Sequence, residues 1–223
     1  MGLLSDQDRE TVRERLAVIQ QPVTLLFFTQ TFGAPETVYV TKRVLDEIVP
    51  LNDHLSIEEV NLVLDKDRAA QYGIEHVPAI VLLKDGQDTR MRFLGAPAGY
   101  EFMSLIEAII LAGTDGSGLS AQARSLVAQH VTAPLDIKVF VTPTCPHCPR
   151  AVILAHRLAV ESPLIQASCV EATEFMDLTR RFNVTGVPKT IVNDSIEILG
   201  ALPEEQFVRT VVGAPTSDQS SRA

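Results

Sequence analysis

The feature that most constrains the fold is an internal repeat, in which two distant segments share the same spacing of apolar residues and proline. The first segment, AAQYGIEHVPAIVLL, covers residues 69–83, and the second, TRRFNVTGVPKTIVN, covers residues 179–193. The matched positions are Tyr72 with Phe182, Ile74 with Val184, Val77 with Val187, and Pro78 with Pro188. A repeat of this kind predicts two structural units built on one plan.

Each half of the chain has the pattern helix, strand, helix, strand, helix, strand, strand, helix. The first helix of each half is opened by a serine, Ser5 or Ser120, and is followed by a proline break and a buried strand. After each Val-Pro comes a β-rich run, then a tight-turn signal at Asp85-Gly86 or Asn193-Asp194, then a returning strand. The predicted fold class is therefore α/β, with two tandem units that are each a mixed four-stranded sheet flanked by helices on both faces.

The boundary between the units is predicted from a change in composition. The stretch AGTDGSG, residues 112–118, replaces the apolar periodicity with small and polar residues. We therefore assign residues 1–115 to the first unit and residues 116–213 to the second. The last stretch, residues 214–223, is small and polar and predicts a disordered tail.

Cysteine content and charge narrow the chemistry. The chain has 223 residues, 46% of them apolar, so it can form a core without structural disulfides. Two of its three cysteines are only three positions apart, which does not fit a disulfide framework. The formal net charge of −9 argues against nucleic acid or an anionic membrane as a partner, because phosphate binding needs a surplus of Lys and Arg.

No membrane or secretion signal is recognised in the sequence. The most apolar stretch, FMSLIEAIILAG, contains Glu107 and falls short of the roughly 20 residues that cross a bilayer, so it predicts an amphipathic helix. The N-terminal MGLLSDQDRE lacks the basic and apolar regions of a secretion signal. We therefore expect a cytoplasmic protein.

The sequence TPTCPHCPRAV places Cys145 and Cys148 between a predicted buried strand and a predicted helix. Pro146 fits the first position of that helix, where its missing N–H would have no partner in any case. Cys145 would then lie at the helix N-terminus, where free N–H groups and the helix dipole lower the pKa of a thiol. This pattern predicts Cys145 as a redox nucleophile and Cys148 as the resolving thiol, in an exchange that needs no cofactor.

Other residues near this motif are assigned from their position. We interpret His147, with Pro146, as tuning the redox potential; the alternative is a solvated turn residue. A structural zinc site is disfavoured, since the chain has one CxxC pair instead of two. Cys169 is expected in the core as a small hydrophobe, with a regulatory thiol as the alternative. Glu171 is expected to be solvated and His156 to lie on a helix surface.

With TPTCPHCPRAV and FNVTGVPKTIV, the chain resembles thioredoxin-fold proteins, and its tandem arrangement resembles the two-unit, glutaredoxin-like protein disulfide oxidoreductases of prokaryotes. The resemblance extends over nearly the whole chain. It implies that Cys145 and Cys148 are the redox pair. It also implies that Pro188 is a cis-proline opposite them and that Val187 offers backbone hydrogen bonds to a bound peptide.

The first half has no cysteine in the corresponding place, which holds Phe32-Gly33-Ala34-Pro35. This half is interpreted either as a docking surface or wall of a shared peptide cleft, or as a unit that only stabilises the second. Phe32 is expected to anchor the core, with a substrate-facing aromatic as the alternative. A pair with one active site also resembles the N-terminal domain of the flavoprotein component of alkyl hydroperoxide reductase. Since no flavin domain follows here, we expect electrons from a separate protein.

Together these observations predict an enzyme that reduces protein disulfides by dithiol exchange. A peroxiredoxin is one candidate substrate, and a thioredoxin-reductase-like flavoprotein is the expected electron donor. The reducing direction follows from the expected compartment, because cytosolic thiols are kept reduced. Two alternatives stay open: a dithiol oxidant, which the Pro-His dipeptide favours, and a non-catalytic peptide-binding adaptor.

Overall fold

The computed structural model describes residues 3–213, and each half has the predicted order of elements. The first half contains α1 (Asp6–Leu16), β1 (Val23–Thr29), α2 (Glu36–Ile48), the 3-10 helix η1 (Val49–Leu51), β2 (Leu55–Asn61), α3 (Lys66–Tyr72), β3 (Ala79–Lys84), β4 (Gln87–Leu94) and α4 (Glu101–Gly113). The second half contains α5 (Ala121–His130), β5 (Leu135–Val141), α6 (Cys148–Glu161), β6 (Ile165–Glu171), α7 (Met176–Arg181), β7 (Lys189–Val192), β8 (Ile196–Leu199) and α8 (Glu204–Val212). The predicted tail, residues 214–223, lies outside the described residues.

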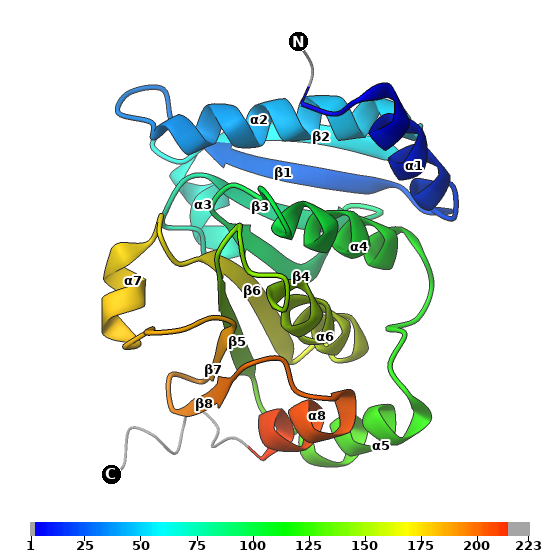
Figure 1. Ribbon diagram of the computed structural model, residues 1–223, viewed down its shortest axis with the longest axis vertical. Coiled ribbons are helices and arrows are strands. Elements are labelled where there is room, and N and C mark those ends of the chain that lie inside the picture. The colour runs from blue at the N-terminus through cyan, green and yellow to red at the C-terminus, as the bar shows by residue number, and fades with distance from the viewer. Residues whose placement is uncertain (1–2, 214–223) are drawn as a thin grey trace.

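The eight strands of the described chain form one sheet in the order β2-β1-β3-β4-β6-β5-β7-β8 (Figure 1). Each half contributes the predicted mixed four-stranded sheet, with one parallel pair and two antiparallel pairs. The sequence did not predict that the halves join. They do so through parallel pairing of β4 with β6, in which Met91 lies opposite Ala167. The boundary after residue 115 falls in the connection between α4 and α5, and it stays a prediction.

Helices cover both faces of the sheet, as predicted, because successive side chains point to opposite faces and both sets are apolar in the central strands. On β1, Leu25 and Phe27 belong to a large core that continues through both units, whereas Leu26 and Phe28 belong to a smaller core on the other face. The large core also includes residues of α1, α2, α4, α5, α6 and α8. The opposite face carries two separate cores, one with α3 and one beside α7.

The helix starts follow local sequence chemistry. Ser5 caps α1 by accepting a hydrogen bond from the Asp8 amide at 3.1 Å, and Ser120 caps α5 by accepting one from the Ala123 amide at 3.1 Å. Both caps confirm the predicted serine-opened helices. Within residues 3–213, no helix has the length and apolar character that crossing a membrane requires.

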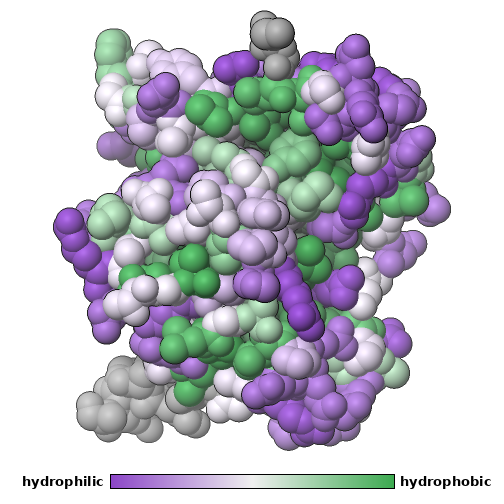
Figure 2. Space-filling model, viewed as in Figure 1, coloured by the Kyte–Doolittle hydropathy of each residue, from purple (hydrophilic) through white to green (hydrophobic). Residues whose placement is uncertain are grey.

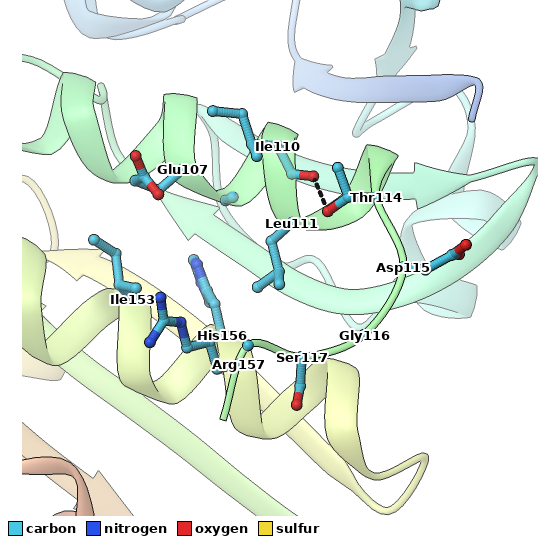
Figure 3. A pocket seen from close by; sticks show the side chains of 12 residues that line it. Glu107, Ile110, Leu111, Thr114, Asp115, Gly116, Ser117, Ile153, His156 and Arg157 are labelled. Atoms are coloured by element: carbon cyan, nitrogen blue, oxygen red, sulfur yellow. Dashed lines mark hydrogen bonds between the residues drawn. The ribbon is translucent and has the colours of Figure 1, made fainter. Parts of the chain in front are cut away.

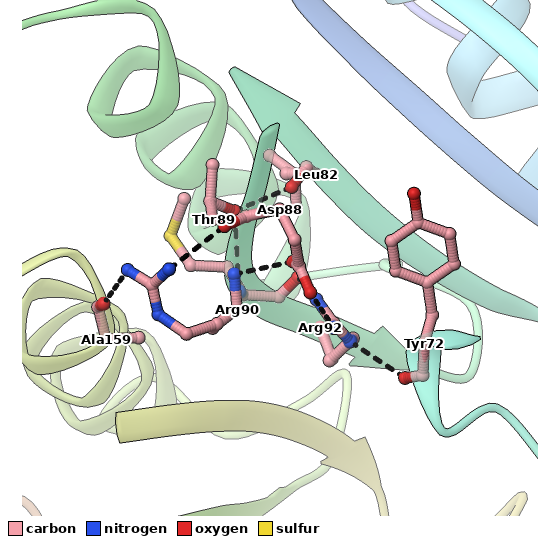
Figure 4. A network of polar contacts seen from close by, with 8 residues as sticks. Tyr72, Leu82, Asp88, Thr89, Arg90, Arg92 and Ala159 are labelled. Atoms are coloured by element: carbon pink, nitrogen blue, oxygen red, sulfur yellow. Dashed lines mark hydrogen bonds and ion pairs between the residues drawn. The ribbon is translucent and has the colours of Figure 1, made fainter. Parts of the chain in front are cut away.

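A polar network on β4 reaches both units (Figure 4). The side chain of Arg92, only 3% exposed, lies 2.6 Å from the Asp88 carboxylate and donates to the carbonyl of Tyr72 at 3.4 Å. Arg90 donates at 2.7 Å to the carbonyl of Ala159, in the last turn of α6. Strand β4 therefore joins the second unit through its backbone and through a side chain.

Candidate active site

Cys145 and Cys148 lie where β5 passes into α6, and they form a disulfide with their Cα atoms 5.5 Å apart. The Cys145 amide donates to the carbonyl of Thr142 at 3.1 Å, and the Cys148 amide donates to the carbonyl of Cys145 at 3.4 Å. The two residues differ in burial, since Cys145 is 8% exposed and Cys148 is 0% exposed. Of the pair, Cys145 is thus the one that solvent reaches.

The start of α6 corrects one sequence expectation. The helix begins at Cys148, not at Pro146, and His147 takes the cap position. Pro149 explains the difference. If Cys145 capped the helix, the amide of residue 149 would donate the first intrahelical hydrogen bond to the Cys145 carbonyl, and a proline has no N–H to donate. In the first turn of the observed helix, the missing N–H of Pro149 costs no hydrogen bond, because N–H groups there have no intrahelical acceptor. Cys145 therefore lies in the turn that leads into the helix.

Pro146 and His147 are both exposed on this turn, between the two cysteines. The His147 side chain makes no cap hydrogen bond to the helix. The two residues therefore form the solvent face of the dithiol loop, and their effect on the redox potential stays a prediction.

Val187 and Pro188 come directly before β7, which pairs with β5 in the sheet. The peptide bond between them is cis, and Phe140 of β5 lies opposite Lys189 of β7 in the antiparallel register. That register brings the residues just before Lys189 alongside the carboxyl end of β5, from which the dithiol loop starts. Val187 packs against the core cluster that contains both cysteines. A role in substrate binding stays a prediction.

Glu101, which the sequence did not single out, is a buried carboxyl group at the start of α4. It is 1% exposed, and the Cys169 thiol donates to it at 3.6 Å. Its Oε1 atom has no hydrogen-bond partner within the described residues. Burial raises the pKa of Glu101 to about 7, so this group changes protonation near neutral pH. Its only sequence signal was a position at the start of a predicted helix, where acids are common.

Glu101 is linked to the dithiol loop through the backbone. The amide of Tyr100 donates at 3.0 Å to the carbonyl of Pro143, two residues before Cys145. Gly99 adopts a positive φ of 58°, and an added Cβ atom there would meet the Pro143 carbonyl oxygen at 2.2 Å. Only glycine fits this close approach of the first unit to the dithiol loop.

Cys169 and Glu171 lie on β6, at the junction of the units. Cys169 is 4% exposed, which confirms the expectation of a buried thiol. Glu171 is only 3% exposed, so the expectation of a solvated carboxylate was wrong. It is covered because the backbone of Gly95 packs against its Cβ atom, and its Oε2 atom accepts hydrogen bonds from Thr173 and from the Glu174 amide.

His156 also corrects the sequence analysis, because it is 1% exposed where a surface position was expected. It belongs to α6, and its ring meets that of Phe93 on β4 at a centroid distance of 5.1 Å. Burial lowers the pKa of His156 to about 4, and neither ring nitrogen has a partner within the described residues. The adjoining cavity of about 160 Å³ is lined by α4, α6 and the segment that connects the units (Figure 3). Neither cysteine of the dithiol lines it.

The cysteine-free site of the first unit is open. Phe32 is 90% exposed, so the expectation of a core anchor was wrong. The Val77–Pro78 peptide bond is cis, like its counterpart in the second unit. Beside it lies a pocket of about 340 Å³, lined by Gln30, Pro35, Leu62, Glu75, His76, Val77 and residues 174–178. Among the described residues, no cluster of three or more His, Cys, Asp and Glu side chains is arranged to hold a metal ion.

Comparison with known proteins agrees with this arrangement. A family model described as a thioredoxin domain matches residues 135–213. The chain is 27% identical over 164 residues to the F component of alkyl hydroperoxide reductase from Xanthomonas campestris pv. phaseoli, covering 74% of this chain and 29% of the relative. The corresponding Escherichia coli protein is 27% identical over 154 residues, covering 68% and 27%. The chain thus spans less than a third of the length of these curated relatives.

Two solved structures match almost the whole fold. The NTD_N/C domain of the alkylhydroperoxide reductase AhpF from Enterococcus faecalis superposes with a TM-score of 0.86 at 25% identity, covering 93% of this chain and 99% of that one. A protein disulfide oxidoreductase from Aeropyrum pernix superposes with a TM-score of 0.85 at 30% identity, covering 93% and 92%. With two thioredoxin-like units and a CxxC disulfide in the second, this chain belongs to the two-unit protein disulfide oxidoreductases.

Proposed function

We propose that the protein reduces disulfide bonds of other proteins, with Cys145 as the nucleophile and Cys148 as the resolving thiol. The observation that carries this proposal is the unequal burial of the pair, 8% exposed for Cys145 and 0% for Cys148. A partner sulfur can approach the more exposed thiol, whereas the buried one is within reach only of its neighbour. Cys145 also lies in the turn directly before α6, at the N-terminal end of that helix, where the helix dipole favours a thiolate.

The reaction conserves electrons and atoms in two exchanges. The Cys145 thiolate attacks one sulfur of the substrate disulfide, forming a mixed disulfide and releasing the first substrate thiolate. The Cys148 thiolate then attacks the Cys145 sulfur, closing the intramolecular disulfide and releasing the second substrate thiolate. Each released thiolate takes up a proton, and two electrons pass to the substrate. A dithiol is restored when a donor supplies two electrons and two protons.

The residues around the dithiol have supporting roles in this proposal. Val187, next to Pro188 and beside the dithiol loop, presents its backbone to an extended substrate segment. Pro146 and His147, which form the exposed face of the turn, set the relative stability of the thiolate and disulfide forms.

A peroxiredoxin as substrate and a thioredoxin-reductase-like flavoprotein as donor are part of the same proposal. Their support is the similarity to AhpF-type alkyl hydroperoxide reductase proteins, with the sequence-based expectation of a cytoplasmic location. In a compartment that keeps thiols reduced, a dithiol of low potential runs in the reducing direction.

The mechanism is tested by trapping. The Cys148→Ser variant, reduced and mixed with insulin as a protein disulfide, should accumulate a mixed disulfide through Cys145, because the second exchange is blocked. Cys145→Ser should accumulate none, and Cys169→Ser, which removes only the buried thiol on β6, should behave like the wild-type protein. A Cys148→Ser protein that binds insulin without a covalent bond would instead favour the adaptor.

The direction is tested by the reduction potential of the Cys145–Cys148 pair in glutathione or dithiothreitol buffers. A value near about −270 mV, the thioredoxin range, supports the reductant. A value near about −120 mV would identify a dithiol oxidant and contradict the proposed direction.

A further inference from the structure

The first unit has lost its cysteines but keeps other parts of a substrate site. Val77 lies beside cis Pro78 and lines the pocket of about 340 Å³ at the vacant loop. Within residues 3–213, neither the N–H nor the carbonyl group of Val77 has a hydrogen-bond partner. An extended segment laid against Val77 would therefore find a free backbone donor and acceptor.

Exposed apolar side chains lie on the segments that line this pocket, namely the loops of Gln30, Pro35 and Leu62 and helix α7. Phe32 is 90% exposed and Leu64 is 82% exposed, on the loops that follow β1 and β2. Val63 is 56% exposed, and Met176, which lines the pocket from α7, is 46% exposed. Figure 2 shows hydrophobic surface at the tip of the loop before α2, at the upper left of the molecule. Large exposed apolar side chains on segments that also line a pocket are typical of a surface that binds another chain.

The charge of the pocket indicates what kind of chain fits. Three carboxylate residues line it: Glu75, Glu174 and Asp177. The Oε2 atom of Glu174 is buried with no partner in the described part of the molecule. Asp177 pairs with Arg180 at 3.7 Å, but both side chains are exposed, so this ion pair contributes little. A segment with Lys or Arg between apolar residues is complementary to this combination.

The pocket spans both units. The ring of His76, from the first unit, lies 5.6 Å from the ring of Phe175, from the second. In Figure 1 the loop before α2 and helix α7 lie on the same side of the molecule. A ligand in the pocket would therefore contact the unit that carries the dithiol.

The vacant site and the dithiol also share one edge of the sheet. Strands β1, β4, β6 and β5 run in the same direction, so the loops after them, including residues 30–35 and 142–147, meet at their carboxyl ends. In the strand order, β1 and β5 are four positions apart, or about 19 Å at roughly 4.8 Å for each position. An extended chain covers this distance with about six residues.

We propose that the vacant site of the first unit docks a segment of the substrate protein, the one whose disulfide reacts at Cys145. This segment is extended, contains basic and apolar residues, and lies about six or more residues from the reacting cysteine of the substrate. The inference rests on the proposed function for the identity of the partner. The docking itself needs no thiol. The first unit then holds the substrate while the second unit carries out the exchange.

The test separates docking from redox chemistry by using the full chain with both active-site cysteines replaced, Cys145→Ser with Cys148→Ser. The probe is a fluorescent, cysteine-free peptide of about twelve residues in which lysine alternates with leucine, measured by anisotropy. Into this background we would introduce Glu75→Lys with Asp177→Lys. The matched control is Glu14→Lys with Asp53→Lys, which makes the same change of charge at exposed positions outside the pocket.

We expect the pocket variant, Glu75→Lys with Asp177→Lys, to bind the peptide about tenfold more weakly than its parent. The affinity of the control variant should stay within about twofold of that of the parent. A second variant, Phe32→Ser with Leu64→Ser, removes exposed apolar side chains from the two neighbouring loops and is called the rim variant. It should weaken binding to a similar degree. Equal binding by the pocket and control variants would overturn the proposal, since the attraction would come from net charge alone. The proposal would also be overturned if the parent bound a peptide with glutamate in place of lysine as tightly as it binds the lysine peptide.

A second copy of this chain is the competing occupant of the site. Sedimentation of the parent and the rim variant decides between them. A dimer that dissociates on Phe32→Ser with Leu64→Ser would assign the surface to self-association and overturn the proposal. A monomer in both cases supports it. None of these readings depends on the insulin experiment, so a failure of the redox mechanism remains distinguishable from a failure of docking.

Discussion

Replacing the buried carboxyl group of Glu101 with an amide should change how stability depends on pH. Burial raises the pKa of Glu101 from its usual 4.5 to about 7. The folded state therefore favours the protonated form, and the stabilisation this gives is fully present below pH 4.5 and lost as the pH rises through 7. At about 1.4 kcal/mol for each pKa unit, the loss amounts to about 3 kcal/mol.

The Glu101→Gln variant keeps the shape of the protonated carboxyl group and does not ionise. Its free energy of unfolding should match that of the wild-type protein near pH 4 and exceed it by about 3 kcal/mol near pH 8. Urea unfolding followed by circular dichroism measures both proteins, because the chain has no tryptophan for fluorescence.

Glu107, on the same helix, provides the control, because it lies in a surface ion pair with Arg15. Glu107→Gln should change the free energy of unfolding by less than about 1 kcal/mol. If the difference between Glu101→Gln and the wild-type protein stayed constant from pH 4 to pH 8, the buried carboxyl group would be titrating as an ordinary one, and the reasoning would be refuted.

Two further predictions concern a backbone contact between the units and the buried ion pair on β4. Gly99→Ala should destabilise the protein by more than about 2 kcal/mol and slow the reaction of Cys145, because the added methyl group meets the Pro143 carbonyl at a positive φ. Gly86→Ala, at a similar φ but with nothing within 4 Å, should lose only about 1 kcal/mol; equal losses in thermal unfolding would argue against the steric contact. Asp88→Asn should reduce the free energy of urea unfolding by about 3 kcal/mol, because it leaves the buried Arg92 without its counter-ion, and a loss below about 1 kcal/mol would contradict this.

The sequence predicted those features that depend on local pattern. Apolar, β-rich runs bounded by turn signals identified the strands, serines marked the starts of two helices, and the two Val-Pro pairs marked equivalent positions in the two units. The position of the dithiol between β5 and α6 followed from the same local signals. Even there, the start of α6 was displaced, since Pro149 competed with Pro146 for the first helical turn.

What the sequence could not predict depends on the contact between the units. The sequence predicts β4 and β6 as strands, but it does not show that they pair with each other. Glu101 and His156 are ordinary helix residues in sequence. They are buried at the contact between the units, where Glu101 meets Cys169 of β6 and the ring of His156 meets Phe93 of β4. The prediction for Phe32 was wrong in the opposite direction: it was expected to be buried in the core, and it is exposed on a loop.

The pairing of β4 with β6 also explains why a unit without cysteines accompanies an active one. Six of the seven residues of β6 are buried, including Cys169. In a second unit standing alone, β6 would be an edge strand with free backbone groups, which invites pairing with other chains. Strand β4 covers that edge, and α4 packs on α6. Because β4 and β6 pair in parallel, the vacant site and the dithiol both lie at the carboxyl ends of the strands. The stabilising role and the proposed docking role therefore follow from one contact.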